Sequence, residues 1–217
     1  MIRTLLLVRH GRTAWNLEGR LQGHADVALD DVGREQADAL GAGLAPLGPA
    51  RLWSSDLRRA EATASVIGAA CALPVVPDPR LREYDVGARS GLTPAEFAEQ
   101  YPEEHAAWNA GAPGPLVPGE EGAAEVAART STALREHMAS LAPGEIGVAV
   151  MHGACIKTAL GALLDWPGAR RALAGLDNGA IAVLVDRGPE LRLVAYNVPP
   201  AGVAALAPDF ASRTAAR

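Results

Sequence analysis

The chain has 217 residues, 49% of them hydrophobic and 21% charged, which is ordinary for one globular domain with a sizeable core. Its net charge of −5 argues against a general surface for nucleic acid or for acidic membranes. The longest apolar run near the N-terminus, Leu5–Val8, is too short for a signal-peptide core or a membrane span, so we expect a cytoplasmic protein. Cys71 and Cys155, the only cysteines, are too few for a disulfide framework and lack the pairing of a zinc site.

Short apolar runs alternate along the chain with segments that have the apolar spacing of helices. The runs are read as strands, and Leu40, Leu44 and Leu47 illustrate the i, i+4, i+7 spacing of a helix. In chain order we expect a buried strand at Thr4–Val8, a helix from Asp30 or Asp31 to about Leu47, a strand at Arg51–Ser54, a helix from Asp56 to about Ala72, an edge strand at Pro74–Pro77, short helices at Thr93–Gln100 and Glu103–Asn109, a helix at Glu121–Leu141, a strand at Gly147–Met151, a helix at Ala154–Leu164, and a hairpin of Ile181–Val185 with Leu191–Tyr196.

Strands that alternate with helices predict an α/β fold, a three-layer sandwich around a mostly parallel central sheet, within one domain spanning 1–217. Residues 92–120 break this rhythm with two short helices and a Pro/Gly-rich loop at Gly111–Gly119. We interpret them as a helical insertion over the functional face rather than a second domain. The Ala-rich tail, about 200–217, is expected to be flexible.

Polar residues follow three of the predicted strands directly. They are Arg9 and His10 after the first, Ser54–Arg59 after the second, and His152 and Gly153 after the fourth. Ligands of parallel α/β sheets bind beyond the carboxyl ends of the strands, so these residues are expected to converge on one site. All but one of the 20 basic residues are arginines, whose planar guanidinium suits phosphate oxygens.

Several motifs of the chain, in order and at matching spacing, resemble the signature of the histidine phosphatase superfamily, also called the phosphoglycerate mutase-like family. Each motif alone is a weak signal, whereas the ordered set spans most of the chain. The motifs are Val8–Asn16, Arg20–Gly23, Leu29–Ala37, Ser54–Ala64, Leu81–Glu83, Pro118–Glu121 and Met151–Gly153.

The resemblance implies that His10 is a nucleophile that forms a phosphohistidine intermediate. A histidine side chain with its ordinary pKa of ~6.5 is largely neutral at neutral pH and can attack phosphorus without a separate base. A transferred phosphoryl group spreads charge over three oxygens, and Arg9, Arg59 and His152 match the family's donors to them. Arg59 is preferred to Arg58 because it directly precedes the alanine of the Arg-Ala-x-x-Thr unit.

The leaving alkoxide needs a proton, and the attacking water must later lose one. A single carboxyl group with a pKa near neutrality can serve both steps. Glu83 matches the family's general acid/base, because it follows Leu-x and precedes the glycine-bearing turn at Gly87, while Asp85 is the local competitor.

The resemblance also implies a set of substrate-binding residues, although a structural role in the loop remains open for Thr13 and Gln22. Arg20 is read as a loop ion-pair partner, and Glu121 with Arg129 as architecture. No metal and no cofactor are expected, and the expected partner is a small phosphate ester, with the chain a monomer or homodimer. The implied binding residues are Arg9, Thr13, Asn16, Gln22, Gly23, Arg59 and Gly153.

Three functions remain to be compared: phosphatase, cofactor-dependent mutase and noncatalytic phosphate-binding module. The turn Gly87–Leu92 resembles that of the mutases, but the paired arginine that mutases carry after a tryptophan is replaced by Asn109-Ala110 after Trp108. A binding module predicts loss of a charged core residue, and none is lost. We therefore favour a phosphatase for small phosphate monoesters, such as sugar phosphates or phosphoglycerate-like compounds. Asp177–Gly179 resembles a segment of actinobacterial glucosyl-3-phosphoglycerate phosphatases.

Overall fold

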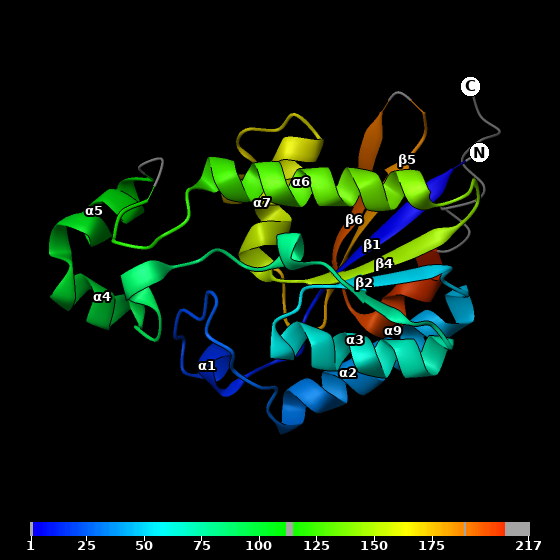
Figure 1. Cartoon of the computed structure of the whole chain (residues 1–217), viewed down its shortest axis with the longest axis horizontal. Helices are drawn as coiled ribbons and strands as arrows, with labels where there is room; N and C mark the ends of the chain where they lie inside the picture. Colours follow the sequence, from blue (N-terminus) through cyan, green and yellow to red (C-terminus); the bar gives the residue numbers. More distant parts are fainter. Residues whose placement is uncertain (1, 112–114, 189, 207–217) are drawn as a thin grey trace.

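The computed structural model describes residues 2–111, 115–188 and 190–206, and a six-stranded sheet runs through its centre (Figure 1). The strands are β1 (Arg3–Arg9), β2 (Arg51–Ser54), β3 (Val75–Pro77), β4 (Ile146–Met151), β5 (Ile181–Asp186) and β6 (Leu191–Val198). Their order is β3-β2-β4-β1-β5-β6, with the first four parallel, β5 antiparallel to β1, and β6 antiparallel to β5. The predicted mostly parallel sheet, with β3 at its edge, is confirmed.

The longer helices lie where the apolar spacing predicts them. Asp30 is the residue that caps the second helix, because its side chain accepts the Gly33 N–H. The four-residue helices were not predicted, since one turn is too short to show a periodicity. The helices are α1 (Ala14–Leu17), α2 (Asp31–Leu44), α3 (Arg58–Cys71), α4 (Pro94–Gln100), α5 (Pro102–Ala110), α6 (Ala123–Ser140), α7 (Gly153–Leu163), α8 (Ala169–Ala172) and α9 (Pro200–Val203), with 3-10 turns at Ala45–Leu47, Pro79–Leu81, Gly87–Arg89 and Ala204–Leu206.

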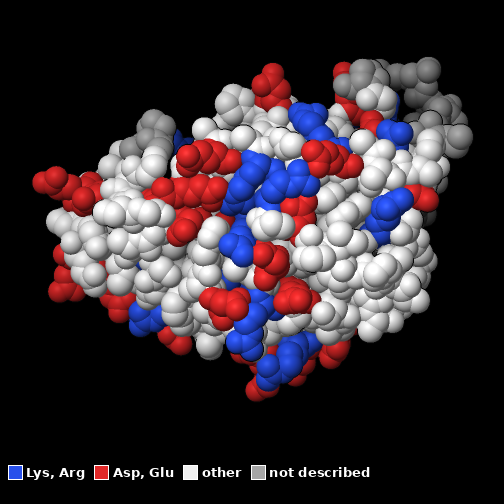
Figure 2. Space-filling model, viewed as in Figure 1, with Lys and Arg blue, Asp and Glu red and all other residues white. Residues whose placement is uncertain are grey.

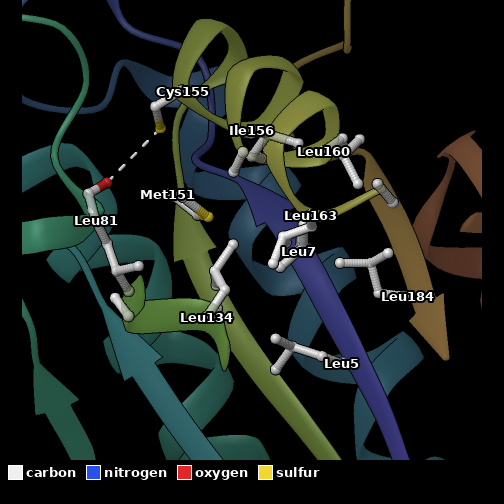
Figure 3. Close-up of a cluster of buried hydrophobic side chains, with 14 of the residues drawn as sticks. Leu5, Leu7, Leu81, Leu134, Met151, Cys155, Ile156, Leu160, Leu163 and Leu184 are labelled. Carbon is white, nitrogen blue, oxygen red and sulfur yellow. Dashed lines mark hydrogen bonds between the residues drawn. The ribbon is translucent and has the colours of Figure 1, made fainter. Parts of the chain in front are cut away.

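Helices cover both faces of the sheet, α6 and α7 on one and α2, α3 and α9 on the other (Figure 1). Leu5 and Leu7 of β1 pack with α6 and α7 (Figure 3), whereas Leu6 and Val8 pack with α2 and α3. Successive side chains of a strand point to opposite faces, so a strand covered on both sides must be apolar throughout. The confirmed three-layer sandwich follows directly from that run.

The tail after Pro199 is packed at its beginning, which differs from the expected flexible segment. α9 lies against α2, and Val203 is buried among the apolar residues of that layer. Burial of Val203 explains the difference: in an Ala-rich segment, this single larger apolar side chain gave no periodic pattern from which packing could be predicted. Residues 207–217 lie outside the described residues.

The predicted insertion contains α4 and α5, which lie beyond the end of the sheet (Figure 1). Arg89, in the turn Gly87–Leu92, is buried, pairs with Glu120 and lies 5.2 Å from the centre of the Phe97 ring. This contact fastens α4 to the segment before α6. Residues 112–114 of the predicted loop lie outside the described residues.

The loop after β1 is pressed against the first turn of α2, and both backbones are glycine at the contact. An added Cβ on Gly11 would overlap the Gly33 carbonyl oxygen, and one on Gly33 would overlap the Arg12 carbonyl oxygen. The Asp30 N–H donates to Arg12 O at 3.0 Å across the same contact. Two backbones can approach so closely only without side chains between them.

We predict that Gly33→Ala lowers the free energy of unfolding by about 3 kcal/mol, because backbone must move to relieve the overlap. Helix propensity alone would favour alanine by about 1 kcal/mol, so the sign separates the two effects. Urea denaturation followed by circular dichroism measures the change. Gly175→Ala, whose added Cβ meets no atom within 4 Å, is the control, and a Gly33→Ala variant of wild-type stability would contradict the prediction.

Candidate active site

A cavity of about 390 Å³ lies beyond the carboxyl ends of the strands. Its walls come from the end of β1, the loop before α2, the start of α3, the segment around Glu83, the insertion, α7 and the segment before β5. The lining residues are Arg9, His10, Asn16, Arg20, Leu21, Gln22, Gly23, Arg59, Glu83, Tyr84, Val86, Arg89, Trp108, Leu116, Glu120, Glu121, Ala123, Gly153, Ala154, Lys157, Arg170, Gly175 and Leu176.

His10 is buried where β1 ends, and its surroundings fix which ring nitrogen carries the proton. Nδ1 lies 2.6 Å from the Gly11 carbonyl oxygen, which can only accept, so Nδ1–H is the donor. Nε2 therefore keeps its lone pair, and the Arg59 Nε–H points toward it at 3.3 Å. The ring thus presents an unprotonated nitrogen to a cation.

Arg59, at the start of α3, is buried and forms no ion pair with a carboxylate in the described part of the chain. Its terminal nitrogens donate to Ala25 O at 2.8 Å and to Gly23 O at 2.7 Å, and its Nε–H is shared between His10 Nε2 and His152 Nδ1, 3.2 Å away. Burial lowers the pKa of Arg59 to about 10, so the guanidinium remains charged at neutral pH. Two carbonyl oxygens and two imidazole nitrogens, all uncharged, thus hold the guanidinium in place. Its charge is left without a counter-ion among the described residues.

His152 is brought next to His10 but lies behind Arg59 rather than in the cavity wall. The two imidazole centroids are 5.0 Å apart. Since Nδ1 accepts from Arg59, Nε2 carries the proton and donates to Ser55 Oγ at 2.9 Å. Ser55 was not singled out from sequence; its position one residue after β2 was the available signal.

Both histidines are held neutral. Burial lowers the pKa of His10 well below its ordinary value, and the neighbouring charges of Arg59 and Arg9 lower it further. Burial and Arg59 act in the same direction on the pKa of His152. A neutral imidazole is the nucleophilic form, so the cations keep His10 ready to react.

Arg9 places a second guanidinium in the cavity. It donates to the Leu176 carbonyl, and its buried Nε has no hydrogen-bond partner among the described residues. The segment before β5 fixes the His10 backbone and the Asn16 side chain, because Asn178 Nδ2 donates to His10 O at 3.1 Å and to Asn16 Oδ1 at 3.3 Å.

The Glu83 carboxylate lies against the N-terminal turn of α7. Its Oε1 accepts the N–H groups of Tyr84 and Cys155, at 3.0 and 2.9 Å, and Oε2 accepts the Ala154 N–H at 3.0 Å. Each carboxylate oxygen can accept about two hydrogen bonds. Oε2 therefore retains one free acceptor position, and Glu83 is among the residues that line the cavity.

A half-buried ion pair holds the backbone beneath Glu83. Arg129 of α6 is paired with Glu121 at 2.6 Å, and it donates to the carbonyls of Arg80, Arg82 and Glu83 at 2.8, 2.8 and 2.9 Å. This pair is the architecture that the sequence suggested. The Cys155 thiol donates a weak hydrogen bond to Leu81 O in the same segment (Figure 3).

The cavity separates the predicted binding residues into two groups. Asn16, Gln22, Gly23 and Gly153 line it, and Gln22 Oε1 is buried without a hydrogen-bond partner among the described residues. Thr13 is buried elsewhere, where it caps α1 and donates to Asn16 Oδ1. Of the two alternatives for Thr13, the observed contacts correspond to a structural role.

Asp85, the alternative to Glu83, and Arg58, the alternative to Arg59, do not line the cavity. Asp85 is 47% exposed in its side chain and faces His24, with 3.6 Å between Oδ2 and Nδ1. Arg58 is exposed on α3. Sequence reasoning missed Lys157 and Arg170 in the wall; the signal for Lys157 was its position four residues after Gly153 on one helix.

The described residues contain no group of three or more His, Cys, Asp or Glu side chains arranged to hold a metal ion. Within the same part of the chain, none of the helices has both the length and the apolar composition needed to cross a bilayer. On the face drawn in Figure 2, acidic and basic side chains intermingle over the centre.

Comparison with known proteins gives consistent matches. A family model described as histidine phosphatase superfamily (branch 1) matches residues 5–199. Glucosyl-3-phosphoglycerate phosphatase of Mycobacterium tuberculosis is 37% identical over 187 residues, 82% of this chain and 83% of that protein. A probable phosphoglycerate mutase, GpmB, of Cronobacter sakazakii is 34% identical over 74% of each chain. The structure of a mycobacterial glucosyl-3-phosphoglycerate phosphatase in complex with VO3 is similar with a TM-score of 0.83 and 37% identity, covering 90% of this chain and 99% of that one.

The neutral buried histidines predict a loss of stability in acid. Their pKa values are lowered in the folded state, so protons bind preferentially to the unfolded chain. Their contribution is therefore fully present above pH ~6.5 and is lost as the pH falls, at up to about 1.4 kcal/mol per pH unit for each histidine. Urea denaturation between pH 4.5 and 8 should give a shallower acid slope for His152→Asn than for the wild type. Parallel curves would show that His152 is not held neutral.

Proposed function

Because the chain belongs to the histidine phosphatase superfamily and is a phosphoric monoester hydrolase, we propose that His10 is its nucleophile and Glu83 its general acid/base. The observation that carries this proposal is the free Nε2 lone pair of His10, which faces the uncompensated charge of Arg59. A phosphate dianion supplies the counter-charge that Arg59 and Arg9 lack. Binding therefore brings the phosphorus to the nucleophile.

In the first step Nε2 of His10 attacks phosphorus while the bond from phosphorus to the ester oxygen breaks. Arg59 Nε–H, already directed at Nε2, donates to the transferring phosphoryl group, and Arg9 neutralises a second oxygen. His152 stays neutral behind Arg59, where its Nδ1 accepts from the Arg59 Nε–H and holds the guanidinium beside the nucleophile. Glu83 gives the proton on Oε2 to the leaving oxygen.

In the second step water attacks the phosphohistidine, and the ionised Glu83 takes the water proton. The P–N bond breaks, inorganic phosphate leaves, and neutral His10 is regenerated with Glu83 protonated as at the start. One carboxyl group serves both steps because both reacting oxygens occupy the same side of phosphorus in turn. The backbone N–H groups of α7 hold Glu83 in that place.

Mutase-type transfer is the second candidate, favoured by the similarity to the probable phosphoglycerate mutase of C. sakazakii. Such an enzyme passes the phosphoryl group to another substrate hydroxyl rather than to water. With 3-phosphoglycerate as substrate, isomerisation that exceeds phosphate release would replace hydrolysis as the main activity.

We expect His10→Ala to lower kcat for p-nitrophenyl phosphate by at least about 10³-fold, since no other group lies where the nucleophile must be. Release of p-nitrophenol measures the rate. Acid-labile ³²P on the denatured wild-type protein, absent from the variant, identifies the intermediate. His105→Ala, at a half-buried position on α5, serves as control, and wild-type activity in His10→Ala would refute the mechanism and favour a site elsewhere.

Glu83→Gln should lower kcat/KM by about 10²- to 10⁴-fold for an alkyl ester such as glycerol 3-phosphate, but much less for p-nitrophenyl phosphate. The nitrophenolate leaves without a proton, and kcat/KM reports the steps up to phosphoryl transfer, before water is activated. Asp85→Asn, the exposed neighbour, is the matched control, expected within about twofold of wild type. Equal losses for both esters in Glu83→Gln would assign Glu83 a structural role.

A further inference from the structure

Two cations at the outer end of the cavity have no partner of opposite charge among the described residues. They are Lys157 on α7 and Arg170 on α8. The carboxylates of the same wall are occupied, Glu120 by Arg89 and the Leu116 N–H, and Glu121 by Arg129. The cavity therefore has uncompensated positive charge at two places, around His10 and at this outer end.

The positions of the two cations are set by elements that also hold the reacting groups. Lys157 follows Gly153 by four residues on α7, one turn and about 6 Å along the axis on the same face. The Arg170 guanidinium lies 5.2 Å from the centre of the Tyr84 ring, and Tyr84 directly follows Glu83. Tyr84 is fixed in turn by its hydroxyl, 2.6 Å from Thr158 Oγ1.

This geometry defines a path for the leaving group. The ester oxygen must lie at Glu83 Oε2 to receive its proton, so the rest of the leaving group extends past Tyr84 toward Lys157 and Arg170. Both cations also line a neighbouring cavity of about 390 Å³, walled by α6, α7 and Trp166, which leaves room for groups beyond them.

We propose that Lys157 and Arg170 form an anion subsite, which selects phosphate monoesters whose leaving group carries a second anionic group, a carboxylate or another phosphate. The proposal rests on the proposed function, because it takes the ester oxygen to lie at Glu83. An anion between the two cations relieves their mutual repulsion, which together with burial lowers the pKa of Lys157. A neutral leaving group gains nothing there.

Matched substrates test the subsite. 3-Phosphoglycerate and glycerol 3-phosphate differ in a carboxylate against a hydroxymethyl group, and propane-1,3-diol bisphosphate offers a phosphate instead. For Lys157→Met, Arg170→Met and the double variant we expect kcat/KM for 3-phosphoglycerate or the bisphosphate to fall roughly 10- to 100-fold, with glycerol 3-phosphate within about twofold. Whichever anionic ester loses more identifies the group that the subsite prefers.

Lys157→Arg should restore most of the preference, because it retains the charge, and Arg192→Gln on the surface of β6 should change nothing. A wild type without preference for anionic leaving groups, or a preference that survives in the double variant, would overturn the subsite. Failure of the proposed function is a separate outcome, since His10→Ala would then retain hydrolysis of glycerol 3-phosphate and p-nitrophenyl phosphate alike.

Discussion

The buried guanidinium of Arg59 is the group on which the rest of the site depends. Burying an uncompensated charge is costly unless hydrogen bonds hold it, and the carbonyls of Gly23 and Ala25 supply them without cancelling the charge. The same guanidinium faces His10 and His152 and keeps both neutral. In the proposed mechanism, this one residue both attracts the phosphate and keeps the nucleophile, His10, unprotonated.

Proton transfer is built on a different element, and this separation lets the two roles coexist. Glu83 is held by the first N–H groups of α7, and the Arg129–Glu121 pair fixes the backbone beneath it. Arg59 is positioned instead by α3 on the other side of the sheet. In the proposed mechanism the phosphorus lies between these two groups, so the packing of the two helical layers on the sheet sets the geometry of the reaction.

Farther along α7, the same helix that holds Glu83 carries Lys157 into the outer part of the cavity. Under the two proposals, the charge near His10 serves any phosphate ester, whereas the charge beside Tyr84 distinguishes between leaving groups. The residues for the reaction and for selectivity would then lie about one helical turn apart on α7. Both are positioned by the packing of α7 on β1 and β4 (Figure 3).

The sequence by itself determined the layered fold and the residues near His10, because both depend on local patterns. An apolar strand buried on both faces, such as β1, must have helices on each side, and polar residues after parallel strands must meet at one edge. Tertiary structure alone decided which neighbours matter. Ser55 behind His152, the position of Thr13 outside the cavity, the packed Val203 and the cation pair of Lys157 with Arg170 all depend on contacts between segments distant in the chain. Such contacts leave no periodicity or spacing in the sequence, since they arise only when separate helices and loops pack together.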